Sequence, residues 1–452
     1  MKARFFGWLF TFPPSSIFVF LLFLLAGSVG AQSADSLRPA DLPLGIIDTI
    51  IVLGNQRTKE YVILDEMTLQ RGMEATSEAI EFDRSRIYSL GLFNRVDLWY
   101  DSLDGKGIVH IDVSERWYII PLPVFGFAEG DPKKPYYGGG VLHNNFRGRN
   151  QKLFGLVTFG YNPSLALSFR DPQVNREHNL YFAGGLSYVR VRNKSEREAS
   201  ITGDFDELHY NLNATLGKRF TLYETVGFSF GYEIVHIKDY RPGRTVSTDG
   251  RDAFLLGSLS YVFDSRDLRE YASDGRFLYV GVTKYGFGES ELSFIRLNLD
   301  VRRYVPLFSE FTIAGRVHGT VVSGGLIPTY ARAYFGYGEK IRGYFDTIFE
   351  GEDMLGASVE LRYPLLKART IHFTAIPLPP EFSVWRFGIG LALFGDTGVT
   401  WFRGEGIQWT DFSSGYGAGI HFLLPYSIVL RTEYAWNELF EGQFILDLKA
   451  SF

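Results

Sequence analysis

Apolar and polar residues alternate with a period of two along the second part of the chain. In residues 208–216 the even positions are apolar and the odd positions carry His, Asn or Thr. In residues 295–302 the odd positions are apolar, and Arg, Asn, Asp and Arg occupy the even ones. This alternation predicts strands with one face in an apolar medium and the other in water. Residues 116–452 have room for sixteen strands of about ten residues each, so we expect a transmembrane β-barrel of sixteen antiparallel strands.

Composition favours this barrel over a soluble β-sandwich, which would show the same alternation. Aromatic residues make up 16% of the chain, whereas the mean hydropathy is only −0.02. A soluble protein would have to bury these rings in a core, while a membrane barrel displays them at both interfaces. The chain contains no cysteine, so its stability cannot come from disulfides. The net charge of −5 argues against nucleic-acid binding.

Residues 1–31 have the features of an export signal. Lys2 and Arg4 give a positive start, residues 17–26 are uniformly apolar, and small residues at positions 29–31 suit cleavage. The alternative is a retained membrane anchor, but the apolar run is too short to span a bilayer as a helix. Residues 32–45 are polar and contain proline, which predicts a linker.

Residues 46–115 predict a small α+β domain in the order β-α-α-β-β. We expect a strand over residues 46–53, a helix with Thr58 as its N-cap that runs through Met67, and a second helix with residues 80, 87 and 90 on one face. Two alternating strands follow, joined by a turn at Asp104-Gly105. The sequences of residues 50–58 and 90–96 resemble those of a polypeptide-transport-associated (POTRA) domain, and the alternative is a generic α+β module. There is room for only one such domain.

The barrel part resembles the BamA/TamA superfamily of outer-membrane assembly and translocation barrels, which includes the bacterial surface antigens. The resemblance rests on fragments whose order and spacing are specific: residues 138–142, 145–150 and 264–267, Asp274-Gly275, Ile341-Arg342-Gly343-Tyr344, residues 356–365 and residues 394–398.

Glu360 and Asp396 lie on the polar phase of two apolar strands, so both are predicted to point into the lumen. An inward carboxylate usually does no more than line a wet lumen. Arg342, in a polar loop of residues 336–353, has a donor fork suited to carboxylates. The resemblance implies that this loop folds into the lumen and that its arginine reaches these strands. Our hypothesis is a lumen latch formed by Arg342, Gly343, Tyr344, Glu360 and Asp396.

Four further patterns bear on function. Gly415, Gly417 and Gly419 share one phase of a late strand, which indicates tight packing against the infolded loop or, as an alternative, a gate. The terminal Phe452 on an alternating strand resembles a C-terminal insertion signal, with an ordinary last strand as the alternative. Residues 227–231 match G-x-S-x-G but lack the strand-to-helix elbow that a hydrolase needs. The histidines show no metal-binding spacing.

The resemblance implies a non-enzymatic protein that inserts or translocates client polypeptides at the bacterial outer membrane, with the POTRA-like domain in the periplasm. It implies no nucleotide and no cofactor. The expected partners are client polypeptides, outer-membrane lipid and periplasmic or lipoprotein accessory proteins, and no nucleic acid. A single POTRA-like domain favours a specialised role. The alternatives are a passive outer-membrane pore and a structural or lipid-transfer barrel.

Overall fold

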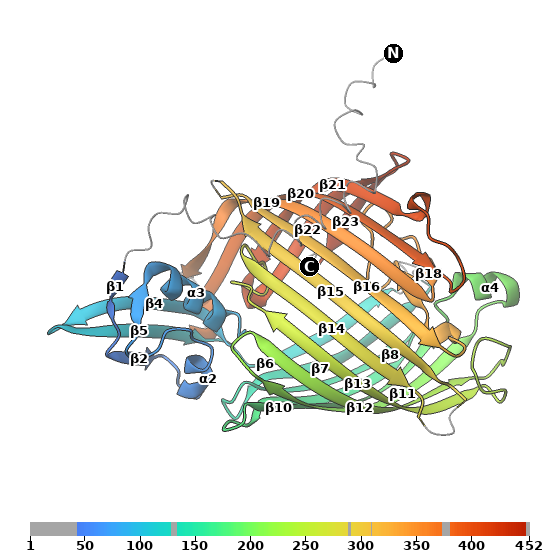
Figure 1. Ribbon diagram of the computed structural model, residues 1–452, viewed down its shortest axis with the longest axis horizontal. Coiled ribbons are helices and arrows are strands. Elements are labelled where there is room, and N and C mark those ends of the chain that lie inside the picture. Colours follow the sequence, from blue (N-terminus) through green and yellow to red (C-terminus); the bar gives the residue numbers. More distant parts are fainter. Residues whose placement is uncertain (1–42, 128–132, 288–290, 309, 373–379, 449–452) are drawn as a thin grey trace, which may run out of the picture.

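The structure is a computed structural model that describes residues 43–127, 133–287, 291–308, 310–372 and 380–448. The predicted export signal at residues 1–31, most of the linker and Phe452 lie outside the described residues. A small α+β domain stands at one end of a large barrel-shaped sheet (Figure 1). No helix in the described ranges is long and apolar enough to cross a membrane.

The small domain contains two sheets and two helices. Strands β2, β5 and β4 form one sheet, in which β2 and β5 are parallel, and β1 pairs with β3 in a second. The elements are β1 (Pro43–Ile46), β2 (Thr49–Leu53), α2 (Glu60–Leu64), β3 (Glu74–Thr76), α3 (Ser77–Tyr88), β4 (Phe93–Leu103) and β5 (Lys106–Glu115). The buried core lies between the helices and the three-stranded sheet and includes Ile63, Ile87, Val109 and Ile111.

Two details of this domain differ from the sequence-based expectation. The strand expected over residues 46–53 is broken at Ile47, which is buried, and at Asp48, which accepts a hydrogen bond from the Gly107 amide at 2.7 Å. Thr58 is not a helix N-cap, because α2 begins at Glu60 and ends at Leu64. The buried Thr58 hydroxyl instead contacts the Tyr118 hydroxyl and the Asn145 amide, each at 2.9 Å. Contacts to the barrel thus replace the cap.

The remaining chain forms an antiparallel sheet of sixteen strands, which confirms the predicted fold class. The strands are β6 (Ile119–Phe127), β7 (Pro135–Phe146), β8 (Gln151–Gly160), β9 (Ser164–Asn175), β10 (Leu180–Arg192), β11 (Asp206–Arg219), β12 (Glu224–Ile237), β13 (Arg251–Asp264), β14 (Gly275–Tyr285), β15 (Phe294–Pro306), β16 (Thr312–Gly324), β19 (Asp353–His372), β20 (Val384–Trp401), β21 (Ser413–Leu424), β22 (Ile428–Asn437) and β23 (Gly442–Asp447). Short elements lie in the connections: α4 (Glu196–Thr202), η3 (Thr329–Ala331), β17 (Ala333–Phe335), β18 (Phe349–Gly351), α5 (Pro380–Ser383), η4 (Trp409–Asp411) and η5 (Pro425–Ser427).

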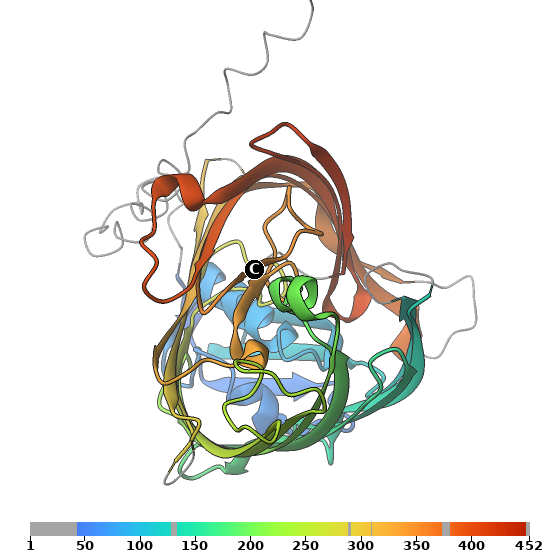
Figure 2. The same ribbon diagram turned by 90° about the vertical axis from the view of Figure 1, so that its right-hand side faces the viewer.

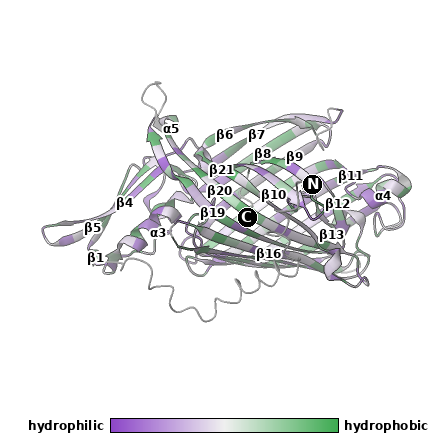
Figure 3. Ribbon diagram, turned by 90° about the horizontal axis from the view of Figure 1, so that it is seen from above, coloured by the Kyte–Doolittle hydropathy of each residue, from purple (hydrophilic) through white to green (hydrophobic). Residues whose placement is uncertain are grey.

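Each strand pairs with its neighbour in the order from β6 to β23, and the sheet curls into a ring (Figure 2). Over the described residues, β6 and β23 are the two ends of the sheet and do not pair with each other. Hydrophobic and hydrophilic residues are interleaved along the barrel strands (Figure 3). Leucines at positions 212, 297 and 393 are exposed on the outside, whereas Glu360, Asp396 and Glu433 lie on the opposite phase of their strands and are buried inside. This is the arrangement of a barrel whose outer surface contacts lipid.

Candidate functional site: an arginine cluster in the barrel lumen

The connection between β16 and β19 folds into the barrel (Figure 2). It contains the small hairpin of β17 and β18, and the segment between these two strands carries Arg342. Ile341 is 2% exposed and packs with Phe335 and Met354, so the loop has an apolar core of its own beside the barrel wall. This packing presents the Arg342 side chain to the inward faces of the last strands.

Arg342 meets both carboxylates of the predicted latch. Its Nε and Nη2 atoms donate to the two Asp396 carboxylate oxygens at 2.7 Å each, and its backbone amide donates to the same group at 3.1 Å. Its Nη1 atom donates to Glu360 at 2.6 Å. All three side chains are almost fully buried. The bidentate pair uses the fixed planar fork of the guanidinium, which lysine cannot reproduce.

The cluster extends to residues that the sequence-based hypothesis missed. Arg342 Nη1 also donates to Glu433 on β22 at 3.1 Å. Glu433 accepts a further contact from His421 on β21 at 3.0 Å, and the other ring nitrogen of His421 lies 2.9 Å from the Tyr271 hydroxyl. Glu433 could have been found from the alternation in β22, since Thr432 and Tyr434 belong to the apolar outward phase.

Two further arginines extend the cluster along the inside of the barrel wall. Arg362 donates to Glu360 at 2.7 Å, and Arg431 lies 3.4 Å from Glu433 and 2.6 Å from Asp447. The guanidinium carbon of Arg342 lies 3.7 Å from the centre of the Phe394 ring, which adds a cation–π contact. Removal of one partner from such a buried network leaves a charge that nothing compensates.

Two glycines allow the loop to approach the wall. Gly343 has a φ of +102°, and a Cβ atom there would lie 2.9 Å from the Trp436 carbonyl oxygen. At Gly415 on β21, a Cβ atom would lie only 1.6 Å from the Arg342 carbonyl oxygen. Gly417 is equally constrained, because its Cβ would meet the Tyr434 carbonyl oxygen at 2.1 Å and the Phe394 ring at 2.7 Å. Gly415 therefore provides tight packing under the loop, whereas Gly417 packs against the neighbouring strands.

A second ion pair fixes the loop to β16, the strand that pairs with β19. Glu339 receives two hydrogen bonds from Arg316 on β16, at 2.9 and 3.0 Å. Arg316 also donates to Asp300 on β15 at 2.9 Å. The loop is thus bound to neighbouring strands from β16 to β22, and Glu339 is a further residue that the sequence-based hypothesis missed. Of the other predicted latch residues, Tyr344 packs edge-on against Phe349, with ring centres 5.4 Å apart.

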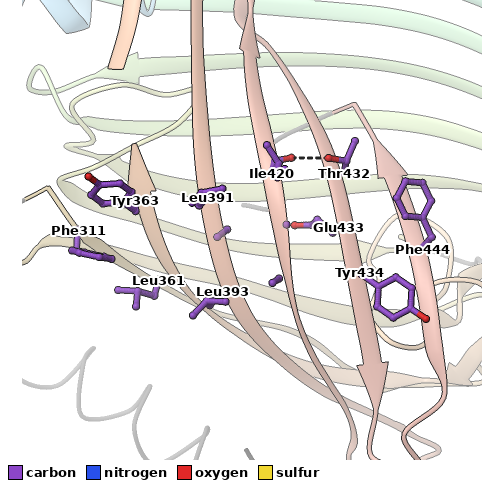
Figure 4. Close-up of a pocket in the computed structure, with 13 residues that line it drawn as sticks. Phe311, Leu361, Tyr363, Leu391, Leu393, Ile420, Thr432, Glu433, Tyr434 and Phe444 are labelled. Carbon is purple, nitrogen blue, oxygen red and sulfur yellow. Dashed lines mark hydrogen bonds between the residues drawn. The ribbon is translucent and has the colours of Figure 1, made fainter. Parts of the chain in front are cut away.

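The outer surface of the same strands is apolar. A groove of about 650 Å³ runs across it and is lined by Leu361, Leu391, Ile420, Tyr434, Phe444 and their neighbours. Figure 4 shows these side chains on neighbouring strands, with the Thr432 hydroxyl bonded to the Ile420 carbonyl oxygen at 3.2 Å. The β21 and β22 backbones therefore separate a lipid-facing surface from the charged cluster inside.

A third set of charges joins the small domain to the barrel. Glu66 accepts hydrogen bonds from Arg86 of α3 at 2.9 Å and from Arg219 at the end of β11 at 2.9 Å. Burial raises the pKa of Glu66, but the positive charges of Arg219, Arg269 and Arg86 outweigh it, so the pKa lies below its ordinary value. Arg269, in the turn after β13, also donates its amide to Ser89 at 3.2 Å.

These features define a class: a sixteen-stranded outer-membrane barrel with a loop bound in its lumen and a small α+β domain docked at one end. Residues 145–441 match the Omp85 superfamily domain, and residues 46–116 match the surface antigen variable number repeat, which is the POTRA family. The chain belongs to the Omp85 superfamily. Its resemblance to the BamA/TamA group and its outer-membrane location, with the POTRA domain in the periplasm, are confirmed.

Relatives support the same assignment. The chain is 23% identical over 393 residues to the outer membrane protein assembly factor BamA of Nitratidesulfovibrio vulgaris, which covers 81% of this chain and 45% of that protein. It is 24% identical over 303 residues to BamA of Neorickettsia risticii, covering 60% of this chain and 37% of that one. The chain thus spans less than half the length of these curated relatives.

Two solved structures share the fold. The crystal structure of Haemophilus ducreyi BamA lacking POTRA domains 1–3 matches with a TM-score of 0.53 at 15% identity, covering 99% of this chain and 94% of that one. CdiB from Escherichia coli matches with a TM-score of 0.53 at 11% identity, covering 89% and 74%.

Proposed function

We propose that this protein inserts or translocates client polypeptides at the outer membrane, without nucleotide, cofactor or enzymatic chemistry. The observation that carries the proposal is the pair of sheet ends, β6 and β23, which do not pair with each other over the described residues. Strand edges with unpaired backbone groups can template an incoming strand. Backbone pairing tolerates many client sequences, and burial of the client's apolar face in lipid would supply the free energy.

The lumen latch gives this proposal a mechanical basis. The loop binds β19, β20 and β22 through Arg342, and it also reaches β23, because the Phe345 amide donates to Gln443 at 2.9 Å. We infer that the loop holds the strands next to the β23 end in register while a client strand pairs there.

Depletion of the gene tests the function. We expect the levels of one or more outer-membrane barrel proteins to fall after depletion, while periplasmic proteins stay constant. Re-expression of the parent chain should restore them, and Arg342→Ala should restore them less well. Unchanged outer-membrane proteins after full depletion would refute an insertion or translocation role.

A passive pore is the competing function, and the bound loop argues against it. Residues 336–352 lie across the lumen and are held by ion pairs to Arg316 and Asp396. The purified barrel should therefore show small conductance in planar bilayers. Large, steady currents from the parent protein would favour the pore instead.

A further inference from the structure

A cavity of about 500 Å³ lies where the POTRA domain meets the barrel wall. One wall is apolar and comes from α2 and its neighbours, with Val62, Leu64 and Met67. The opposite wall is cationic. Its five basic residues come from the ends and turns of the barrel strands: Arg149, Lys152, Arg170, Arg219 and Arg269.

The negative charges at this cavity are too few to balance the cations. Of the described residues, only Asp65 and Glu66 bring carboxylates to its lining. Glu66 is bound by Arg219, and Asp65 accepts a hydrogen bond from Gln173 at 2.6 Å. Arg269 also lies 3.5 Å from Asp264, outside the lining, and Arg219 is bound to Glu66, so the excess positive charge comes from Arg149, Lys152 and Arg170, for which the described residues provide no carboxylate partner.

Lys152 and Arg170 contribute most to this excess. They are directly opposite each other in the β8–β9 pair, and neither forms an ion pair with a carboxylate among the described residues. Like charges at directly opposed positions destabilise a sheet. An anion bound between them would remove that repulsion. The buried Nε atom of Arg149, also on this wall, has no hydrogen-bond partner in the described structure.

The position of the two residues selects the kind of anion. Arg170 lies on the phase opposite to Leu165 and Leu167, which are exposed on the lipid-facing surface. A lipid headgroup on the outer surface therefore would not reach the cavity, whereas a chain in the periplasm would. The apolar wall from α2 would suit hydrophobic side chains placed between acidic ones.

We propose that this cavity binds an acidic, partly apolar segment of a client polypeptide as it enters from the periplasm, an inference that rests on the proposed function. Arginine forks bind carboxylates in a bidentate manner, and a lysine adds a mobile positive charge. The site would hold the client beside the POTRA domain before the client reaches the strand edge.

Binding of a labelled peptide to the full chain in lipid nanodiscs tests the site. The probe is a short fluorescent peptide of alternating Glu and Leu, and the matched probe replaces Glu with Gln. The double variant carries Lys152→Gln and Arg170→Gln. We expect its Kd for the acidic probe to be about tenfold or more above that of the parent, because hydrogen bonds to charged groups are lost. The matched control is Lys218→Gln, which removes a charge from an exposed position outside the cavity.

Three results would overturn this site. One is equal binding of the acidic peptide by the double variant and by Lys218→Gln. The second is equal binding of the Glu and Gln probes. The third is a phosphate analogue that binds at the cavity and is displaced by pyrophosphate but not by the acidic peptide. The double variant should also be at least as heat-stable as the parent, since it relieves repulsion. If peptide binding is unaffected but depletion still lowers outer-membrane proteins, this site fails and the proposed function stands.

Discussion

Replacement of Arg342 by alanine is the sharpest test of the lumen cluster. The change removes two side-chain hydrogen bonds from Asp396 and one each from Glu360 and Glu433. Glu360 keeps Arg362 as a partner. Among the described residues, Asp396 keeps only the backbone amide of residue 342, so it carries most of the cost.

The expected loss follows from burial. The side chains of Arg342 and Asp396 are each 4% exposed, so the remaining carboxylate cannot be solvated without movement of the loop. Breaking a buried pair in this way costs about 3–5 kcal/mol. Arg342→Lys should recover only part of this free energy, because a single ammonium group cannot reproduce the bidentate contact.

Thermal unfolding of the purified barrel, followed by the gel mobility of unheated and heated samples, measures the effect. The control is Arg403→Ala, whose partly exposed side chain pairs with Glu352 at 2.8 Å and donates to the Gly324 and Gly325 carbonyl oxygens; these solvent-accessible contacts should contribute less than the buried Arg342 contacts. The double variant of Arg342→Ala with Asp396→Ala should lose less stability than the two single losses added together. An Arg342→Ala barrel as stable as Arg403→Ala would refute the latch.

Three further outcomes are expected. Gly415→Ala should lower barrel stability, because its Cβ would collide with the Arg342 carbonyl oxygen, whereas Gly406→Ala, in open space, should not; equal melting curves would contradict this. Glu66→Gln should loosen the POTRA domain at neutral pH, measured by limited proteolysis. Because the folded-state pKa of Glu66 is lowered, the difference in proteolysis rate between Glu66→Gln and the parent should shrink as the pH falls below the ordinary pKa of a glutamate. A difference that stays constant with pH would argue against this ion pair. Thr58→Val should cost about 1–3 kcal/mol at the domain junction by leaving buried polar partners unsatisfied, and an unchanged proteolysis rate would exclude it.

The period-two alternation predicted the strands, because a strand that separates lipid from water must alternate along its whole length, and the aromatic-rich composition favoured a barrel over a sandwich. Glu360 and Asp396 were found for the same reason. Their inward direction is a local property of each strand. It follows from the alternation with apolar residues of the same strand, such as Leu361 for Glu360 and Leu393 for Asp396. The side of a strand on which a residue lies can therefore be predicted from the sequence alone.

Contacts between distant segments could not be predicted from the alternation within single strands. Glu433 follows Arg342 by 91 residues, and nothing in the β22 alternation says that the loop arginine reaches it. Thr58 has the residue type and position of an N-cap, but tertiary contacts override that local preference. Which polar residues meet is set by the curvature of the sheet and by the path of the infolded loop.

The two ends of the sheet are held by different parts of the molecule. Tyr118 directly precedes β6, and its hydroxyl contacts Thr58 of the POTRA domain. At the other end, Gln443 of β23 accepts a hydrogen bond from the loop at Phe345. The POTRA domain also contacts the turn between β21 and β22, where Arg116 donates to the Ser427 hydroxyl at 3.4 Å, so its displacement would act near both ends of the sheet. Under the proposed function, the arginine cluster would resist this displacement in β19, β20 and β22, and β6 would be the end that moves more readily.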